Sequence, residues 1–439
     1  MGYFEELDWK AAHHRFKYGG KTKRAALSMI CWLFKSLFKN MEDLYVDKLR
    51  VDLIDADLDY FEDDSALRVD PIPAIPLSYK EKKDYPLPAI SISGGGEQKP
   101  KIAVWATGGF GDLLIVSACI KEIYEQFGKP IIDVFYHIPA NSDFVFKNVL
   151  YVNKVYDRKL YQKMQGGYQI VLEMLQHIVP AKANIKSLAK EPKLANFMLA
   201  LKKHNKKYFK FIASRPQFDG AFADIMVNNF GKNRFLAMSF DPYFKFSKDA
   251  KPFIYLDNKD LNIIKDNGLE SKKFITVQHG WDNTSKSKNS ATKAWFLDYW
   301  IEFVKKFKEK FPDIAIVQIG GANGEDIDGI DARLRAKTTY NQAAILIKNS
   351  LLHIDTEGGM VHLAHILGIK SVVLFGPTNK DYFAYENNIN ISAGTCSNCW
   401  WLTNDWLIKC PNGYRQAECM RAIKPDMVLK AVSEYISGL

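Results

Sequence analysis

The sequence lacks long uncharged apolar runs, and this absence limits where the protein works. No stretch of about 18 uncharged apolar residues occurs, so we expect no segment to span a membrane. We also expect no secretory signal, because the apolar run 25–38 starts late, is interrupted by Lys35 and has no small-residue cleavage site after it. We therefore expect a cytoplasmic protein, with or without a peripheral contact at the inner membrane.

Signatures of nucleic-acid-binding folds are absent as well. The sequence has no helix-turn-helix, zinc-finger or RNA-binding motif. Its net charge of +10 and pI near 9.0 nevertheless favour anionic partners, such as nucleotide phosphates, phosphorylated glycans or acidic membrane surfaces. We expect no nucleic-acid partner; the rival reading, a basic nucleic-acid-binding protein, predicts steeply salt-dependent binding to oligonucleotides.

Acidic residues are missing from residues 9–41, which carry eight basic ones. Apolar residues from Leu27 to Phe38 recur there at helical spacing, which predicts a basic amphipathic helix. Such a helix either binds an anionic surface or partner, or packs on its own protein. The acidic and then proline-rich stretch that follows ends in a glycine-rich loop, so residues 1–98 are predicted to be an N-terminal extension with a linker.

The 439 residues are too many for one core, and two α/β domains are predicted, at 99–250 and 251–439. In the first, a buried strand at 101–107 is followed by the turn 108–112, an apolar helix at 113–127 and a strand at 131–136. The turn is not the dinucleotide fingerprint, since its glycine spacing differs and no acidic residue follows where a ribose would need one. Asp112 in this turn either caps the helix or faces a ligand.

The second domain repeats the alternation of strands and helices. Strands are predicted at 274–278, 314–319, 351–354 and 371–375, and helices at 296–311, 339–348 and 360–367. The glycine-rich turns 320–325 and 355–359 lie at strand ends, where open α/β sheets bind ligands and where free N–H groups of a helix start suit phosphate. The fold class is therefore α/β, with two Rossmann-like domains that face one cleft.

Two segments carry a resemblance to a known family. DTEGGMVHLAHILGIKSVVLFGPT (355–378) resembles the nucleotide-sugar motif of glycosyltransferase family 9, the ADP-heptose heptosyltransferases, and GGFGDLL (108–114) resembles that family's N-terminal motif. The resemblance covers roughly residues 100–435. It implies a GT-B fold, inversion at the sugar's anomeric carbon and no metal in the chemistry, with 99–250 as the acceptor domain and 251–439 as the nucleotide-sugar domain.

The resemblance also implies roles for individual residues. Asp112 matches the family's candidate base, and Lys293, in the segment Lys293-x-Trp295, matches a cation that neutralises the departing diphosphate. Donor binding is assigned to Gly108, Gly109, Gly111, Gly321, Glu325, Asp355, Thr356, Gly358, Gly359, Met360 and His362. Within that set Glu325 matches a carboxylate that contacts the ribose hydroxyls. Glu357 is an insertion relative to the commoner turn of the family.

Cysteine is scarce, and four of the six residues are close in sequence. The spacing Cys396-x2-Cys399-x10-Cys410-x8-Cys419 is typical of a tetrahedral four-thiolate metal site, which leaves no position open for water and is therefore structural. Zinc is the default by ligand type, and iron also accepts four thiolates. The alternatives are two disulfides or four unrelated thiols. Trp400, Trp401 and Trp406 form either the core of this finger or a platform for an acceptor or a neighbouring subunit.

The expected function is an inverting glycosyltransferase that moves heptose from ADP-heptose to an acceptor hydroxyl. A comparable cysteine finger occurs in the branch of the family that resembles bacterial autotransporter heptosyltransferases, which favours a protein serine as acceptor. The basic N-terminal helix and the lysines of residues 186–210 favour instead a lipopolysaccharide inner core. A non-catalytic sugar-nucleotide-binding protein is a rival, and a homo-oligomer is left open.

Overall fold

The computed structural model describes residues 99–183, 188, 191–208, 219–248, 250–280, 292–394, 396–403 and 405–439, all within the compact unit Phe61–Leu439. The predicted extension 1–98 with its basic helix lies outside the described residues. None of the helices in these ranges is both long and apolar enough to cross a membrane.

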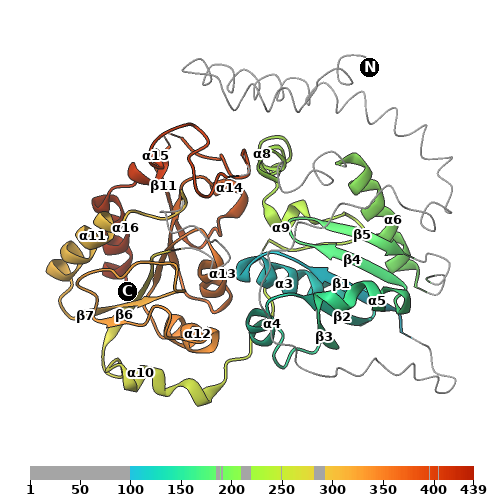
Figure 1. The fold of residues 1–439 in the computed structure, drawn as a ribbon, viewed down its shortest axis with the longest axis horizontal. Helices are drawn as coiled ribbons and strands as arrows, with labels where there is room; N and C mark the ends of the chain where they lie inside the picture. Colours follow the sequence, from blue (N-terminus) through green and yellow to red (C-terminus); the bar gives the residue numbers. More distant parts are fainter. Residues whose placement is uncertain are drawn as a thin grey trace. The chain divides into compact units, whose positions relative to one another are not determined.

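The N-terminal half is built on a five-stranded sheet in the order β3-β2-β1-β4-β5 (Figure 1). Its strands are β1 (Lys101–Ala106), β2 (Ile131–Tyr136), β3 (Lys154–Asp157), β4 (Ile170–Met174) and β5 (Ile178–Ala183). The first four run parallel, and β5 pairs antiparallel with β4. The apolar side chains of β1 are buried because helices cover both faces of a parallel sheet.

The helices of this half follow the strands. They are α3 (Phe110–Gln126), α4 (Pro139–Val145), α5 (Tyr161–Met164), α6 (Pro192–Lys207), α8 (Asp219–Phe230) and α9 (Arg234–Ala237), with short 3-10 turns η2 (Arg158–Leu160) and η3 (Gln165–Gly167). The lysine-rich stretch contains α6, whose Leu194, Phe197, Met198 and Leu201 are buried. This amphipathic pattern turns the α6 lysines toward solvent.

The C-terminal half carries a six-stranded parallel sheet in the order β11-β10-β9-β6-β7-β8. Its strands are β6 (Lys273–Gln278), β7 (Ile314–Ile319), β8 (Ala332–Arg333), β9 (His353–Thr356), β10 (Ser371–Phe375) and β11 (Ile389–Ser392). Its helices are α10 (Asn262–Asp266), α11 (Leu297–Lys310), α12 (Tyr340–Lys348), α13 (Gly359–Ile366), α14 (Lys380–Phe383), α15 (Glu418–Arg421) and α16 (Pro425–Ser437), with the 3-10 turn η5 (Asn258–Asp260). Two Rossmann-like sheets were predicted, and both are present.

Two boundaries differ from the sequence prediction where ligands were expected. Helix α3 begins at Phe110, so Asp112 lies inside its first turn rather than in the turn before it. Strand β9 continues through Asp355 and Thr356, which were expected in the following turn. Both differences arise because parallel pairing and helix capping draw polar residues into regular elements that an apolar pattern does not include.

Candidate functional site

The site is organised around two helix starts, those of α3 and α13, which meet at two glycines. A β-carbon placed on Gly111 would lie 3.0 Å from the Cα of Gly359 and 2.8 Å from the His362 ring. Only glycine allows the backbones to approach this closely. Each helix start carries partial positive charge and N–H groups without partners within the helix, so their meeting creates a place that favours an anion.

Aromatic packing holds the two helix starts together. The ring of Phe110 stacks on Tyr340, at the start of α12, with centroids 4.2 Å apart. Phe110 also touches Gly359, where an added β-carbon would lie 3.0 Å from its ring. Stacked pairs of this kind contribute about 1 kcal/mol beyond the area that they bury. The relative placement of α3, α12 and α13 is therefore fixed by packing.

Asp112 lies beside this junction and accepts three hydrogen bonds. Its Oδ2 accepts from the N–H of Gly109 at 3.1 Å, and its Oδ1 accepts from Gln176 at 3.1 Å and from Arg234 at 2.6 Å. Asp112 is thus both the helix cap and a half-buried carboxylate with a cation beside it. The two readings of Asp112 from the sequence are compatible, because one oxygen caps the helix and the other takes side-chain donors.

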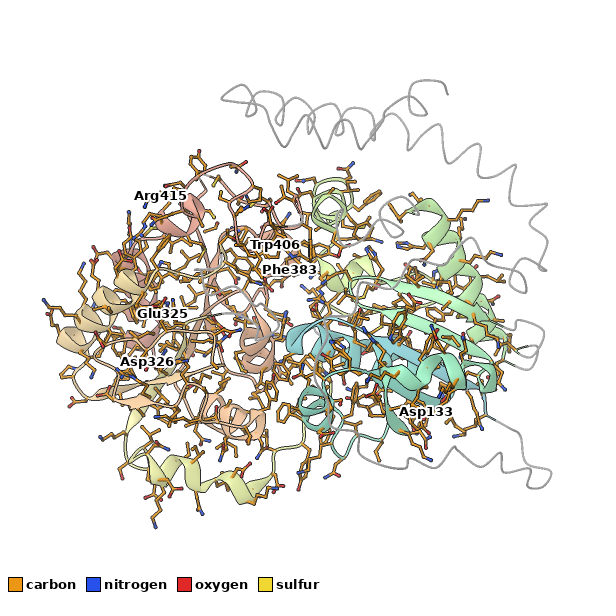
Figure 2. The ribbon with its side chains drawn as sticks, viewed as in Figure 1. Asp133, Glu325, Asp326, Phe383, Trp406 and Arg415 are labelled. Carbon is orange, nitrogen blue, oxygen red and sulfur yellow. The ribbon has the colours of Figure 1, made fainter. Side chains whose placement is uncertain are left out.

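Arg234 is buried, with 3% of its side chain exposed, and it lies 5.6 Å from the ring centre of Phe383, which Figure 2 labels. Helix α9 presents it, and Asn233 caps that helix by accepting from the N–H of Leu236. A buried guanidinium needs a carboxylate partner, and Asp112 supplies it.

A second carboxylate and cation pair lies at the start of α13. The Nζ of Lys293 donates to the Oε2 of Glu357 at 2.6 Å, and 21% and 8% of the two side chains are exposed. Glu357 follows β9 directly and precedes the cap residue Gly358. Glu357 is therefore the side chain that holds Lys293 in this structure.

His362 lies between the two pairs. Its Nδ1 and the hydroxyl of Tyr385 are 2.7 Å apart, and its Nε2 is 3.8 Å from Glu357. Burial, followed by the nearby charge of Arg234, lowers the pKa of His362 to about 3, with Asp112 opposing and Lys293 adding to the effect. The ring is therefore neutral at physiological pH and serves as a hydrogen-bonding group rather than a cation.

Asp355 is buried under the same turn. Burial raises the pKa of its carboxyl, although the N–H of Thr356 donates to it at 2.7 Å and His353 lies 3.5 Å away. The N–H of Thr356 therefore already has an acceptor, whereas no acceptor from the described residues is found for the N–H of Gly359. Of the predicted backbone donors, Gly359 thus suits an anion better than Thr356.

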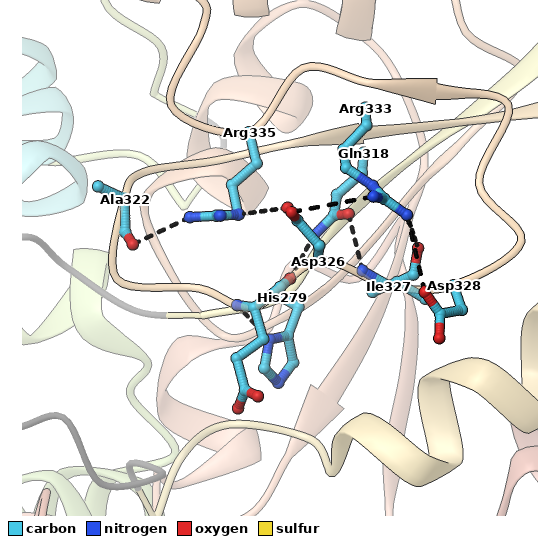
Figure 3. Close-up of polar contacts among 9 residues, drawn as sticks. His279, Gln318, Ala322, Asp326, Ile327, Asp328, Arg333 and Arg335 are labelled. Atoms are coloured by element: carbon cyan, nitrogen blue, oxygen red, sulfur yellow. Dashed lines mark hydrogen bonds and ion pairs between the residues drawn. The ribbon is translucent and has the colours of Figure 1, made fainter.

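The turn from Gly320 to Asp328 follows β7 and is held by polar contacts with neighbouring residues (Figure 3). His279, at the end of β6, accepts from the N–H of Glu325 at 3.0 Å, while the Glu325 side chain remains exposed. Burial lowers the pKa of His279, so its ring is neutral and its Nδ1 is the acceptor. Arg335 holds the same turn through Asp326 at 2.8 Å and the carbonyl of Ala322 at 3.0 Å.

The structure brings together most, but not all, of the predicted residues. Gly108, Gly109, Gly111 and Asp112 lie at the start of α3, and Lys293, Asp355, Thr356, Gly358, Gly359, Met360 and His362 lie at or beside the start of α13. Gly321 and Glu325 belong to the separate turn after β7. The sequence pattern did not indicate Arg234, Gln176, His279 or Tyr385, since a single polar residue carries no periodic signal.

The four-cysteine metal site is not confirmed. Among the described residues no group of three or more histidine, cysteine or acidic side chains is placed as metal ligands would be. Cys396, Cys399, Cys410 and Cys419 are not joined in disulfides, which excludes the disulfide alternative in this structure. The thiols do interact: a hydrogen bond with Cys396 raises the pKa of Cys419, and burial with nearby Cys410 and Cys396 raises the pKa of Cys399 to about 12.

Comparison with known proteins supports a glycosyltransferase. Residues 215–404 match the model of glycosyltransferase family 9 (heptosyltransferase). No curated protein matches the chain. Escherichia coli ADP-heptose lps heptosyltransferase II has a similar structure, with 16% identity and a TM-score of 0.50 over 77% of this chain and 99% of that one. At this identity the likeness shows the fold alone.

Two further solved structures are similar at lower scores. A family 9 glycosyl transferase from Veillonella parvula is 11% identical, with a TM-score of 0.47 over 78% of this chain and 99% of that one. The iron-containing dodecameric glycosyltransferase TibC from enterotoxigenic E. coli is 13% identical, with a TM-score of 0.47 over 78% of this chain and 77% of that one.

Proposed function

We propose that the protein is an inverting glycosyltransferase that moves a heptose from ADP-heptose to an acceptor hydroxyl, and that the acceptor is a serine of an autotransporter-type protein. One observation carries the reaction type: the helix starts of α3 and α13 meet at Gly111 and Gly359, with an aspartate on one side and a lysine on the other. The choice of heptose follows the description of the matching family.

The donor diphosphate is proposed to bind where the two helix starts meet. Its negative charge is complementary to both helix ends and to Lys293, which would exchange the Glu357 carboxylate for a phosphate oxygen. The exposed carboxylate of Glu325 suits the two ribose hydroxyls, since both can donate to it. The neutral ring of His362 adds a hydrogen bond to the sugar or to a phosphate without adding charge.

The transfer is a single displacement at the anomeric carbon. The acceptor oxygen forms a bond to that carbon as the bond to the diphosphate oxygen breaks, and the nucleoside diphosphate leaves with the electron pair. The acceptor's proton passes to a carboxylate oxygen of Asp112. Lys293 stabilises the charge that grows on the leaving phosphate. Attack from the face opposite the leaving group inverts the configuration.

Arg234 has a defined part in this scheme. Its hydrogen bond at 2.6 Å fixes the Oδ1 of Asp112, while among the described residues the Oδ2 accepts only from the N–H of Gly109, at 3.1 Å. A carboxylate held on one oxygen by a buried guanidinium keeps a constant orientation toward the acceptor. Arg234 is therefore a positioning residue rather than the base.

A structural metal held by Cys396, Cys399, Cys410 and Cys419 is also part of the proposal. The donor set suits zinc or iron by ligand type, because both metals accept four thiolates and none of these four thiols is joined in a disulfide. A bound metal would cross-link the segment 396–419 and take no part in the transfer. Elemental analysis of purified protein tests this, and a protein that contains neither zinc nor iron would refute it.

The reaction is tested by incubating the protein with ADP-heptose and candidate acceptors, followed by intact-mass spectrometry of both products. A heptose-sized increase on an autotransporter-type protein, localised to serine, is the expected result. The same increase on lipopolysaccharide core alone would show that the core, and not a protein, is the acceptor. No increase on either would overturn the donor or acceptor assignment.

Two variants separate an enzyme from a sugar-nucleotide-binding protein. Asp112→Asn keeps the side-chain shape but removes the base, and Lys293→Met removes the leaving-group cation. Both are expected to bind ADP while losing at least about a hundredfold in transfer rate. A transfer rate equal to that of the parent protein in Asp112→Asn would end the assignment of the base.

A further inference from the structure

We propose that Thr292 is a positioning residue for Lys293. Through Thr292, residues 400–423, which we call the tryptophan-containing segment, set the place of the leaving-group cation. This inference rests on the proposed function for the role of Lys293. It assigns a task to Thr292 and to the tryptophan-containing segment that neither the sequence motifs nor the comparisons give them.

Thr292 is tied twice to the tryptophan-containing segment. Its N–H donates to the carbonyl of Leu407 at 2.9 Å, and its hydroxyl donates to the carbonyl of Trp406 at 2.7 Å. Only 6% of Thr292 is exposed, so both bonds are shielded from water. Hydrogen bonds that are buried in this way hold a backbone segment in one arrangement.

Trp295, two residues after Lys293, is tied to the same part of the chain. The indole N–H of Trp295 donates to the carbonyl of Ile423 at 2.8 Å, and Trp295 is 1% exposed. Its ring packs edge-on against Trp300 at 4.9 Å in α11. Lys293 therefore lies between Thr292 and Trp295, and both of these residues donate hydrogen bonds to backbone carbonyls within residues 406–423.

The tryptophan-containing segment is itself held in place. The N–H of Trp400 donates to the carbonyl of Pro377, after β10, at 3.0 Å. Gly220 of α8 packs so tightly on the Trp400 carbonyl that a β-carbon there would overlap it. Trp406, labelled in Figure 2, is buried and packs against Trp401 at 5.9 Å. These contacts make the segment a fixed support rather than a free loop.

The geometry points to positioning because Lys293 itself has a single described partner, Glu357, and a long flexible side chain. A lysine that exchanges Glu357 for a phosphate must keep its backbone fixed while its ammonium moves. An error of about 1 Å in such a group costs up to a hundredfold in rate. The two hydrogen bonds of Thr292 fix the backbone next to Lys293.

The test is a double-mutant cycle between Thr292→Val and Lys293→Met, read as kcat and KM for the donor. Thr292→Val keeps the shape but removes the hydroxyl bond, and it is expected to lower kcat about tenfold with a smaller change in KM. Thr292→Ser restores the hydroxyl and is expected to stay within about twofold of the parent protein. In the Lys293→Met background, Thr292→Val should lower kcat by less than about a further twofold, because its effect on the rate passes through the lysine.

Ser433→Ala is the control, since it removes a buried hydroxyl on α16 for which the described residues offer no partner. It is expected to leave kcat unchanged. Thermal unfolding of every variant separates lost stability from lost positioning, and Thr292→Ala replaces the valine variant should that fail to fold.

The outcomes distinguish the inference from the proposed function. Lys293→Met at the parent rate would refute the role of the lysine and with it the proposal. A slow Lys293→Met combined with independent, multiplying losses from Thr292→Val would leave the function standing and overturn the inference. A Thr292→Val protein with unchanged kcat would overturn it as well.

Discussion

Lys293 and Glu357 form a partly buried ion pair, with the ammonium 2.6 Å from the carboxylate, at the helix start where the donor diphosphate is proposed to bind. In this pair the positive charge of Lys293 is already balanced by the carboxylate of Glu357 before a donor binds. A diphosphate that takes the lysine must displace the carboxylate and also tolerate its negative charge nearby. If the diphosphate binds as proposed, Glu357 is expected to weaken the binding of the product nucleotide and to favour its release.

Glu357→Gln is therefore expected to bind ADP about three- to tenfold more tightly, because a neutral amide competes less with phosphate for Lys293. Isothermal titration calorimetry with ADP measures this directly. Glu302→Gln is the matched control: it removes the same charge from an exposed pair with Lys306 on α11 and should not change the affinity. Weaker ADP binding by Glu357→Gln would mean instead that this carboxylate contacts the donor.

Arg234→Met is expected to lower the transfer rate at least tenfold, because it leaves the Oδ1 of Asp112 with only Gln176 as a donor. Arg234→Lys keeps a charge without the planar guanidinium and should recover part of the rate. Initial rates of ADP release give the comparison, with thermal unfolding measured in parallel. A Met variant of normal stability and normal rate would show that Asp112 needs no support from Arg234.

The sequence predicted the regular strands best. The predicted limits of β2, β7 and β10 agree with the structure, since each is an apolar run that begins and ends sharply. The start of α3 was placed three residues too late, because Phe110, Gly111 and Asp112 read as a turn until Gly109 is seen to cap the helix. Local pattern thus identified these elements and misplaced the polar ends where ligands are expected.

The side-chain partners could not be predicted in the same way. Arg234 is separated by 122 residues from Asp112, and Thr292 by 114 from Trp406, so nothing in either local sequence indicates the contact. Glu357 was visible as an insertion, but its pairing with Lys293 depends on how β9 and the segment before α11 meet. Such contacts follow from the tertiary arrangement, which the order of strands and helices alone does not determine.

Gly111→Ala is expected to push apart the starts of α3 and α13, since its methyl group would lie 3.0 Å from the Gly359 Cα and 2.8 Å from His362. The cost to the free energy of unfolding should be about 1–3 kcal/mol, with weaker ADP binding in the folded fraction. Gly167→Ala is the control, because a methyl group there meets nothing within 4 Å. Equal effects of the two changes on ADP affinity would argue against an anion site at this junction.

The pH dependence of stability provides a test that does not rely on substrate. Burial, followed by the charge of Lys251, lowers the pKa of His365 to about 4, and its ring stacks on Tyr385 at 3.6 Å. The unfolded chain takes up a proton at His365 below about pH 6.5, whereas the folded protein does not until about pH 4, so stability falls as the pH drops between these values.

His365→Phe keeps the stacked ring and removes this proton, and the Nε2 of His365 has no hydrogen-bond partner among the described residues for the variant to lose. The loss of unfolding free energy between pH 7 and pH 5 should therefore be smaller in the variant by about 2 kcal/mol. Urea denaturation at both pH values measures the difference. Because burial also lowers the pKa of His362, to about 3, the variant keeps the part of the pH dependence that comes from that ring. An identical pH dependence in both proteins would mean that His365 is accessible to protons in the folded state, and would contradict the packed arrangement of α13 against Tyr385.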